Sequence, residues 1–157
     1  MNANLASQSL YLDKANPDIW KALNAVQLKV REATDAAGLS KDVLELAKVR
    51  ISQLNGCAYC LDLHGRLAVE AGVSARKLHV LAAWREAEIY SELEQAALVV
   101  AEAVTNLPDE DERQAALMGA RNILTEEQYS ALCWSAAVMN AFNRISIISG
   151  HPVRDED

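Results

Sequence analysis

The sequence is poor in the residues that build β-sheets and in those that mark secreted scaffolds. Aromatic residues make up only 5% of the 157 residues, and no alternating Val/Ile/Thr pattern or hairpin dipeptide is present, so strands are not expected. Only three cysteines occur, an odd number in a chain without a recognisable secretory signal, which argues against a disulfide scaffold. Because 51% of the residues are hydrophobic and 24% are charged, the composition also excludes a disordered or collagen-like chain.

The charge balance and the absence of long apolar runs exclude two classes of partner. The formal net charge of −7 does not suit nucleic acid or an anionic membrane surface, which both attract clustered Lys and Arg. No run of about 18 uncharged apolar residues occurs, and residues 1–10 lack the basic start and apolar run of a targeting segment. We therefore expect a cytoplasmic protein with no nucleic-acid or membrane partner, in a compartment that keeps thiols reduced.

What the sequence does contain is alanine, at about one residue in six, which costs least in a helix. The length fits one domain spanning residues 1–157. Helical periodicity together with capping and stop signals predicts an all-α fold of about six to seven helices. These helices begin after Asn16 and Ser40, in the Cys57–Cys60 region, and after Ser74, Ser91, the acidic turn Asp109–Glu112 and Thr125. Glycines or Asn-Pro signals end them at Gly38, Gly56, Gly72, Asn106 and Gly150.

Two of the cysteines, Cys57 and Cys60, form a C-x-x-C pair at the start of a predicted helix. Helical residues three apart have Cα atoms about 5 Å from one another, within the roughly 4.4–6.8 Å range that a disulfide accepts. Near the first turn, the helix dipole and free N–H groups stabilise a thiolate, and such C-x-x-C thiols have pKa values of roughly 3.5–7.5. The pair is therefore a candidate redox site.

His64 lies four residues after Cys60, on the same helical face. An imidazole at this place can accept the Cys60 proton, as in other activated cysteines. Glu45, on the preceding helix, is the acid that we expect to orient the imidazole, since Asp62 points off the shared face. Local physics leaves the nucleophile open, because the helix end favours ionisation of Cys57 whereas His64 favours that of Cys60.

The run from Glu45 to His64, with the pattern E-x(11)-C-x-x-C-x-x-x-H, resembles the alkylhydroperoxidase D-like (AhpD-like) branch of the carboxymuconolactone decarboxylase superfamily. The similarity continues through Trp84 and residues 91–106 to the ending Asn-Ala-Phe-Asn-Arg at 140–144. It covers most of the chain.

This resemblance implies an all-helical thiol peroxidase that forms a homo-oligomer, a trimer or a hexamer, and needs no organic cofactor and no metal. By the resemblance, Cys60 attacks an organic hydroperoxide or hydrogen peroxide, Cys57 resolves the product as a disulfide, His64 is the base and Glu45 relays through it. A dithiol reductant of the lipoyl or thioredoxin type then regenerates the pair. One departure is Tyr59, which stands where the AhpD type has a second His; it is a candidate pocket residue, and the proton relay is then shorter or uses water.

Three other interpretations stay open. The pair can belong to a general disulfide oxidoreductase or a redox sensor. It can hold zinc in a binding protein, although zinc prefers four ligands and Cys57, Cys60 and His64 supply three, so that His79 or Cys133 would have to fold close. The chain can also be a lyase-like or isomerase-like member of the superfamily acting on a small carboxylate, although its decarboxylases are not marked by a C-x-x-C pair.

The remaining chemically notable residues are assigned structural roles. Cys133, between Leu132 and Trp134, is predicted to be a small buried hydrophobe. Trp84 and Trp134 are interpreted as anchors of the core or of a subunit interface. His79 is expected to be a surface or packing residue. His151 stands in a helix stop, before Pro152, and is given no role.

Three polar residues, Asn140, Asn143 and Arg144, stand on the otherwise apolar last helix. Buried polar groups must be hydrogen-bonded, so we expect these residues to lie near a subunit interface or to brace the site. Alanine-rich faces permit close helix approach, which also favours a homo-oligomer.

Overall fold

The architecture is all-α, as the sequence predicts. The computed structural model describes residues 9–154, and this part of the chain contains helices and no strands. The helices are α2 (Leu12–Ala15), α3 (Pro17–Ala36), α4 (Lys41–Asn55), α5 (Ala58–Glu70), α6 (Ala75–His79), the short 3₁₀ helix η1 (Leu81–Ala83), α7 (Trp84–Ala87), α8 (Glu92–Asn106), α9 (Glu110–Arg121) and α10 (Glu126–Ser149).

Local capping chemistry fixes the two best-defined helix starts. At the start of α8 the Ser91 hydroxyl accepts from the Glu94 N–H, and the Glu94 carboxylate accepts from the Ser91 N–H. Thr125 and Gln128 make the same reciprocal pair at the start of α10. Each capping box satisfies two of the N–H groups that a helix start leaves free, and the predicted helix starts after Ser91 and Thr125 are confirmed.

Two other helices begin at the predicted residues but have no side-chain cap. Helix α3 begins after Asn16 with Pro17 at its first position, and the Asn16 side chain makes no capping bond. The side chain of Ser40 makes no capping bond to α4 either, although its extended backbone does begin that helix.

The single short helix predicted after Ser74 is broken into α6, η1 and α7. The Ser74 cap is present, since its hydroxyl accepts from the Lys77 N–H. The backbone then leaves helical geometry at Val80 and Ala83. These breaks turn Leu81 and Trp84 into the core, where they are 0% and 6% exposed, and their burial overrides the periodicity of the segment.

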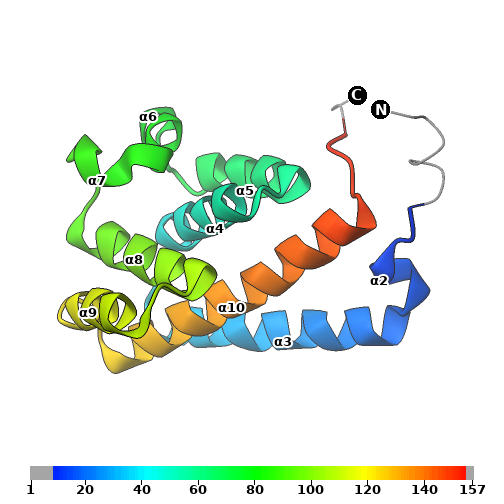
Figure 1. Cartoon of the computed structure of the whole chain (residues 1–157), viewed down its shortest axis with the longest axis horizontal. Coiled ribbons are helices and arrows are strands. Elements are labelled where there is room, and N and C mark those ends of the chain that lie inside the picture. Colours follow the sequence, from blue (N-terminus) through cyan, green and yellow to red (C-terminus); the bar gives the residue numbers. More distant parts are fainter. Residues whose placement is uncertain (1–8, 155–157) are drawn as a thin grey trace.

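Helices α3, α4, α5 and α10 contribute the residues around the site. In Figure 1, α3 runs along the long axis, α10 crosses it obliquely, and α4 and α5 lie above α10. One buried cluster joins α4, α8 and α10 and includes Ile51, Val100 and Met139. A second cluster, around Leu46, Leu81 and Leu98, fixes α6, η1 and α7 against α4 and α8. Helix α4 therefore contacts both clusters.

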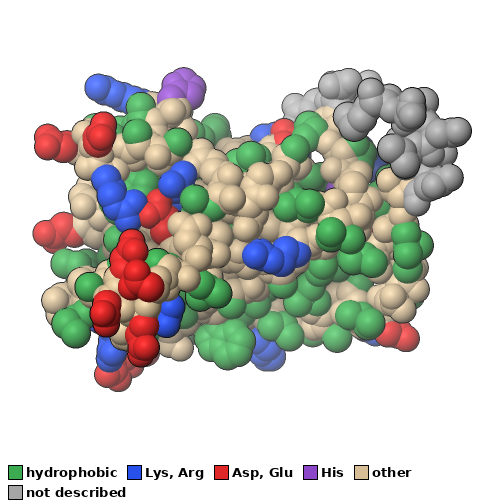
Figure 2. Space-filling view, viewed as in Figure 1, with side chains coloured by type: hydrophobic (Ala, Val, Ile, Leu, Met, Phe, Trp, Pro, Cys, Tyr) green, Lys and Arg blue, Asp and Glu red, His purple; other side chains and the backbone are tan. Residues whose placement is uncertain are grey.

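The surface carries its clearest charge concentration at one end. Figure 2 shows acidic side chains gathered over the end of the molecule that holds α9, whose first turn contains Glu110, Asp111 and Glu112. The Asp109 side chain caps this turn by accepting from the Glu112 N–H. The run is thus a solvated helix start, where negative charge is favoured by the helix dipole.

Helix α10 is long and apolar enough to cross a membrane by length and composition. It is nevertheless a core helix, since it packs on α3, α4 and α8 and buries the polar side chains of Ser135, Asn143 and Ser149. Such a helix is weak support for a membrane segment, because core helices of soluble proteins meet the same criteria.

Candidate functional site

The cysteine pair sits where α4 ends and α5 begins. Gly56 ends α4 in the left-handed conformation, with φ of 68°, which glycine adopts without the steric penalty of a side chain. Cys57 is the N-cap of α5, and its sulfur accepts a hydrogen bond of 3.3 Å from the Cys60 N–H. The two residues form a disulfide, with Cα atoms 5.3 Å apart. The spacing that the sequence predicts for a closable pair is confirmed.

His64 and Glu45 are brought together from neighbouring helices. His64 lies on α5 and its Nδ1 is 2.6 Å from Oε2 of Glu45 on α4. The second carboxylate oxygen of Glu45 accepts from Lys48 Nζ at 2.7 Å. The side chains of Glu45 and His64 are each 13% exposed, so the pair is largely shielded from water without being sealed.

The charge of this pair favours an ionised Glu45. Burial raises the pKa of Glu45, but the hydrogen bond from His64 and the charge of Lys48 outweigh it and leave the pKa below its usual value. An ionised carboxylate requires His64 to donate through Nδ1, and Nε2 is then the basic nitrogen of a neutral ring. The arrangement therefore prepares His64 to accept a proton.

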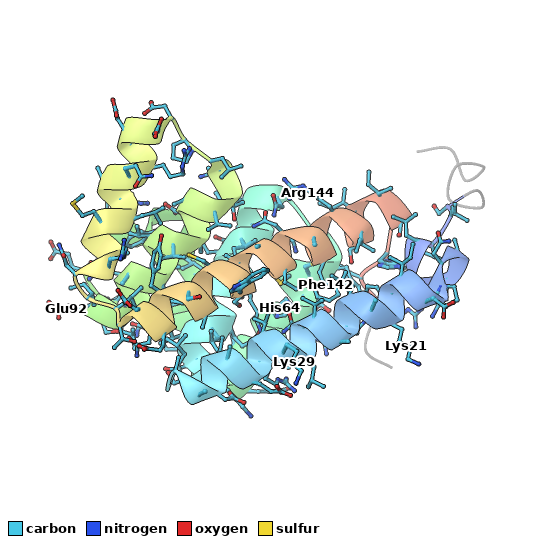
Figure 3. The ribbon with its side chains drawn as sticks, turned by 90° about the horizontal axis from the view of Figure 1, so that it is seen from below. Lys21, Lys29, His64, Glu92, Phe142 and Arg144 are labelled. Carbon is cyan, nitrogen blue, oxygen red and sulfur yellow. A yellow bond between two sulfur atoms is a disulfide. The ribbon has the colours of Figure 1, made fainter. Side chains whose placement is uncertain are left out.

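A cleft of about 650 Å³ opens beside these groups. Its lining includes Cys60, His64 and Glu45 but not Cys57, which is 1% exposed in the core. In Figure 3, His64 and Phe142 both lie in the space between α3 and α10. The volume is typical of pockets for small organic molecules.

The cleft lining is apolar at Trp20 and Phe142 and polar further along α3. Trp20 of α3 and Phe142 of α10 pack edge to face, with ring centroids 5.5 Å apart, and both line the cleft. Further along the same face of α3, one to three turns away, the lining continues with Asn24, Gln27 and Arg31. The cleft can thus hold a molecule with both apolar and polar parts.

Tyr59, the predicted pocket residue, lines the cleft next to Cys60. Its side chain is partly exposed, and its ring lies 5.6 Å from that of His151. His151 is the functional-site candidate that the sequence does not reveal: it lines the same cleft and its Nε2 is 3.1 Å from Oδ1 of Asp13. These two residues are 138 positions apart, and no local pattern connects them.

A buried amide network braces the turn that carries the cysteines. Asn55, the last residue of α4, donates to Asn140 and to Asn143 of α10 at 2.8 Å and 2.9 Å. Asn143 is fully buried and donates to the Ser52 hydroxyl at 3.2 Å. Arg144 is exposed, on the opposite side of α10 from His64 in Figure 3. The expectation that these asparagines brace the site agrees with this geometry.

For the residues that were assigned structural roles, some predictions agree with the structure and others do not. Trp84 is a core residue, and its indole N–H donates to Glu102. Trp134 is not a core residue, since 59% of it is exposed on the outer face of α10. Cys133 is a free thiol only partly buried against the core, and burial raises its pKa. His79 is exposed, as expected for a surface residue.

Of the two acids considered as partners of His64, Glu45 makes the contact and Asp62 does not, as predicted. Asp62 bonds with Arg66 on the surface, at 3.0 Å, whereas Glu45 bonds with His64. Within residues 9–154, no group of three His, Cys, Asp or Glu side chains lies close enough to hold a metal ion. His79 and Cys133 do not complete a ligand set with the cysteine pair.

Comparison with known sequences gives one family and two relatives. Residues 17–103 match the sequence profile of the carboxymuconolactone decarboxylase family. The chain is 33% identical over 126 residues to the uncharacterized protein YdfG of Bacillus subtilis (strain 168), covering 80% of this chain and 86% of YdfG. It is 35% identical over 66 residues to the uncharacterized protein YnjA of Escherichia coli (strain K12), covering 42% of this chain and 36% of YnjA.

The fold is also similar to that of a solved structure. A protein of unknown function from Agrobacterium tumefaciens, described as a candidate AhpD antioxidant-defence protein, superposes with a TM-score of 0.84 at 28% sequence identity. The match covers 94% of this chain and 99% of that one. The helical arrangement around the cleft is therefore shared over nearly the whole length.

Proposed function

The chain belongs to the carboxymuconolactone decarboxylase family, and from that premise we propose that it is a thiol-dependent peroxidase of the AhpD-like type. Its substrates are organic hydroperoxides or hydrogen peroxide. One arrangement supports this proposal. Cys60, which forms a disulfide with Cys57, lines a cleft together with His64, and the imidazole of His64 is held by the Glu45 carboxylate. Each part of that geometry has a role in peroxide reduction.

Cys60 is the nucleophile of the reduced protein. Only the thiolate attacks efficiently, and His64 takes the Cys60 proton through Nε2 while Glu45 holds Nδ1. The thiolate forms a bond to the terminal peroxide oxygen, the oxygen–oxygen bond breaks, and Cys60 becomes a sulfenic acid as the alcohol or water leaves. The contact of Cys60, but not of Cys57, with the cleft supports this choice.

Cys57 resolves the sulfenic acid. Its sulfur attacks that of Cys60, water leaves, and the disulfide seen here is formed. A dithiol reductant of the lipoyl or thioredoxin type returns the pair to two thiols by exchange through a mixed disulfide. No cofactor takes part in this cycle.

A small oxidant suits this site better than a protein disulfide does. Cys60 is only 3% exposed but lines the cleft, so a small oxidant reaches its sulfur through the cleft. A protein disulfide, like a protein dithiol that regenerates the pair, needs a local opening of the fold. A general disulfide oxidoreductase would use the same pair, and the relative rates with peroxide and with a protein disulfide separate the two functions.

We further propose that the protein works in the cytoplasm as a homo-oligomer, a trimer or hexamer. Apolar side chains remain exposed on the outer faces of α3 and α10, among them Ile19, Trp134 and Ile148 at 68%, 59% and 73%. Exposed apolar groups of this size are typical of surfaces that bury one another in an assembly.

Two variants test the proposed roles. Cys60→Ser should abolish peroxide consumption. Cys57→Ser should consume one equivalent and stop as a sulfenic acid that a cyclic diketone traps at Cys60, detected by mass spectrometry. Cys133→Ser is the matched control and should cycle as the unmodified protein does. Trapping at Cys57, or consumption by Cys60→Ser, would contradict the assignment.

A further inference from the structure

A second imidazole–carboxylate pair lines the same cleft from the opposite end of the chain. His151 Nε2 is 3.1 Å from Asp13 Oδ1, and His151 Nδ1 is 3.2 Å from the Ser146 hydroxyl. All three residues line the cleft together with Cys60. The side chains of Asp13 and His151 are 11% and 18% exposed. The result is a continuous chain of carboxylate, imidazole and hydroxyl in the cleft that Cys60 lines.

Backbone contacts hold this chain in place. Gly150 ends α10 in the left-handed conformation, and the His151 N–H bonds back to the Ser146 carbonyl at 3.1 Å. The N-terminal segment is fixed to the same end of α10, because the Leu12 N–H donates to the fully buried Ser149 hydroxyl at 3.1 Å. In Figure 1 the N-terminal helix α2 lies beside the end of α10, and Figure 2 shows an opening in the surface next to these segments.

Aromatic contacts place the imidazole next to the dithiol. The ring of His151 stacks on Tyr11, with centroids 5.2 Å apart. On its other side it meets the ring of Tyr59, which precedes Cys60 in the sequence. The His151 ring therefore contacts the residue that precedes Cys60, in the cleft that Cys60 also lines.

Charged groups of both signs surround His151. Asp13 also contacts Lys14 at 3.3 Å. Burial raises the pKa of Asp13, but the hydrogen bonds from His151 and Lys14 outweigh it and leave the pKa below its usual value. The carboxylate of Asp13 contacts the imidazole, and Lys14 and Arg154 line the cleft nearby. In the protonated ring, Nδ1–H donates to Ser146 and Nε2–H donates to Asp13.

We propose that Asp13, His151 and Ser146 form a proton relay that protonates the leaving oxygen of the peroxide, with Ser146 as the catalytic donor and His151 and Asp13 as positioning residues. This inference rests on the proposed peroxidase function. Both ring nitrogens of His151 are engaged, so the Ser146 hydroxyl is the group left to meet the substrate.

The geometry of displacement at oxygen gives the two imidazoles separate tasks. The sulfur attacks one peroxide oxygen from the side opposite the oxygen that leaves, so the two proton transfers occur at opposite ends of the reacting atoms. His64 shares a helical face with Cys60 and serves the sulfur end. The relay comes from α10 and the chain ends, on another wall of the cleft, and serves the leaving end.

The step balances in atoms and electrons. The sulfur–oxygen bond forms as the oxygen–oxygen bond breaks, and the thiolate is oxidised to a sulfenic acid while the hydroperoxide is reduced to an alcohol. The alkoxide leaves with the bonding electron pair and takes the Ser146 proton. Ser146 takes the Nδ1 proton of His151, and His151 regains a proton from water.

Leaving-group dependence tests the relay. The pre-reduced full-length protein is mixed in a stopped-flow instrument with tert-butyl hydroperoxide, whose leaving alkoxide is a strong base, or with peracetic acid, whose leaving acetate needs no proton. His151→Gln and Ser146→Ala should slow the first reaction by about 10²-fold, the lower end of general acid catalysis, and change the second by less than about twofold. His79→Gln, at an exposed histidine outside the cleft lining, should leave the ratio of the two rates unchanged.

Each outcome decides a different claim. Equal losses with both oxidants, or no loss with either, would overturn the relay while leaving the peroxidase function intact. An unmodified protein that consumes neither oxidant through its thiols would overturn the proposed function itself. Asp13→Asn provides an independent variant, expected to show the same selective loss in a smaller degree.

Discussion

Replacing Glu45 by Gln removes one charge from the centre of the site and keeps its shape. The carboxylate accepts from His64 at 2.6 Å and from Lys48 at 2.7 Å. An amide offers only one acceptor oxygen, so Glu45→Gln cannot serve both partners as the carboxylate does. Lys48 then keeps a charge that is 16% exposed without its partner, and His64 loses the group that fixes its Nδ1 proton.

The expected cost follows from the charge and the burial. A hydrogen bond to a charged group contributes about 1.5–3 kcal/mol, and breaking a buried ion pair costs about 3–5 kcal/mol. Because the isosteric amide retains one bond and the pair is not sealed from water, we expect unfolding free energy to fall by about 2–3 kcal/mol. For a chain of this length that lowers Tm by about 4–12 °C. Loss of an oriented base should slow thiol oxidation by about 10²-fold.

Glu102→Gln is the matched control. Glu102 is a similarly buried carboxylate, 12% exposed, that accepts from Arg50 at 2.8 Å and from the Trp84 indole at 2.9 Å, and it lies outside the cleft lining. Calorimetry and stopped-flow oxidation by hydrogen peroxide are measured for both variants. Glu102→Gln should lower Tm and spare the rate, whereas Glu45→Gln should lower both. An equal loss of rate in the two variants, or an unchanged rate in Glu45→Gln, would refute the role given to Glu45.

Four further outcomes are expected. Since the pKa of Glu45 is lowered from its usual 4.5, its stabilisation is complete above that pH and is lost as pH falls through the folded pKa; urea unfolding should show Glu45→Gln and the unmodified protein converging in acid and diverging at pH 7. Asn143→Ala removes a buried hydrogen-bond partner from both Asn55 and Ser52. In the same assay it should lower the free energy of unfolding by about 1–3 kcal/mol. Cys133→Ser should remove one titratable thiol per chain and leave peroxide turnover unchanged. Trp134→Glu should lower the assembled mass in sedimentation velocity if the outer face of α10 is an interface.

Helix starts and stops were accessible from the sequence because they depend on neighbouring residues. A capping box such as Ser91 with Glu94 satisfies backbone groups three residues away, and Gly56 ends α4 through its own backbone freedom. Helix α2 could not be predicted, because four residues carry no periodicity. The break after Ser74 could not be predicted either, since it is set by the burial of Leu81 and Trp84 against α4 and α8.

The same contrast holds within the site. Cys57, Cys60 and His64 lie on one helix start, so their spacing alone predicts that they share a face. Glu45 was predicted as the orienting acid from its place on the preceding helix, but spacing alone could not bring it to His64, where the structure places it. His151 and Asp13 meet only because the two ends of the chain fold onto the end of α10. Trp134 could not be placed from the sequence either. On a helix that is apolar all round, the sequence does not show which side faces the core, and Trp134 lies on the exposed side.

Thiol titration of the reduced protein is the most direct test of the central claim. The protein is reduced, freed of reductant under anaerobic conditions, and titrated for thiols before and after one equivalent of hydroperoxide per chain. We expect two of the three thiols to be lost per equivalent, with mass spectrometry placing the new disulfide between Cys57 and Cys60. Retention of all three thiols, or oxidation confined to Cys133, would contradict the account.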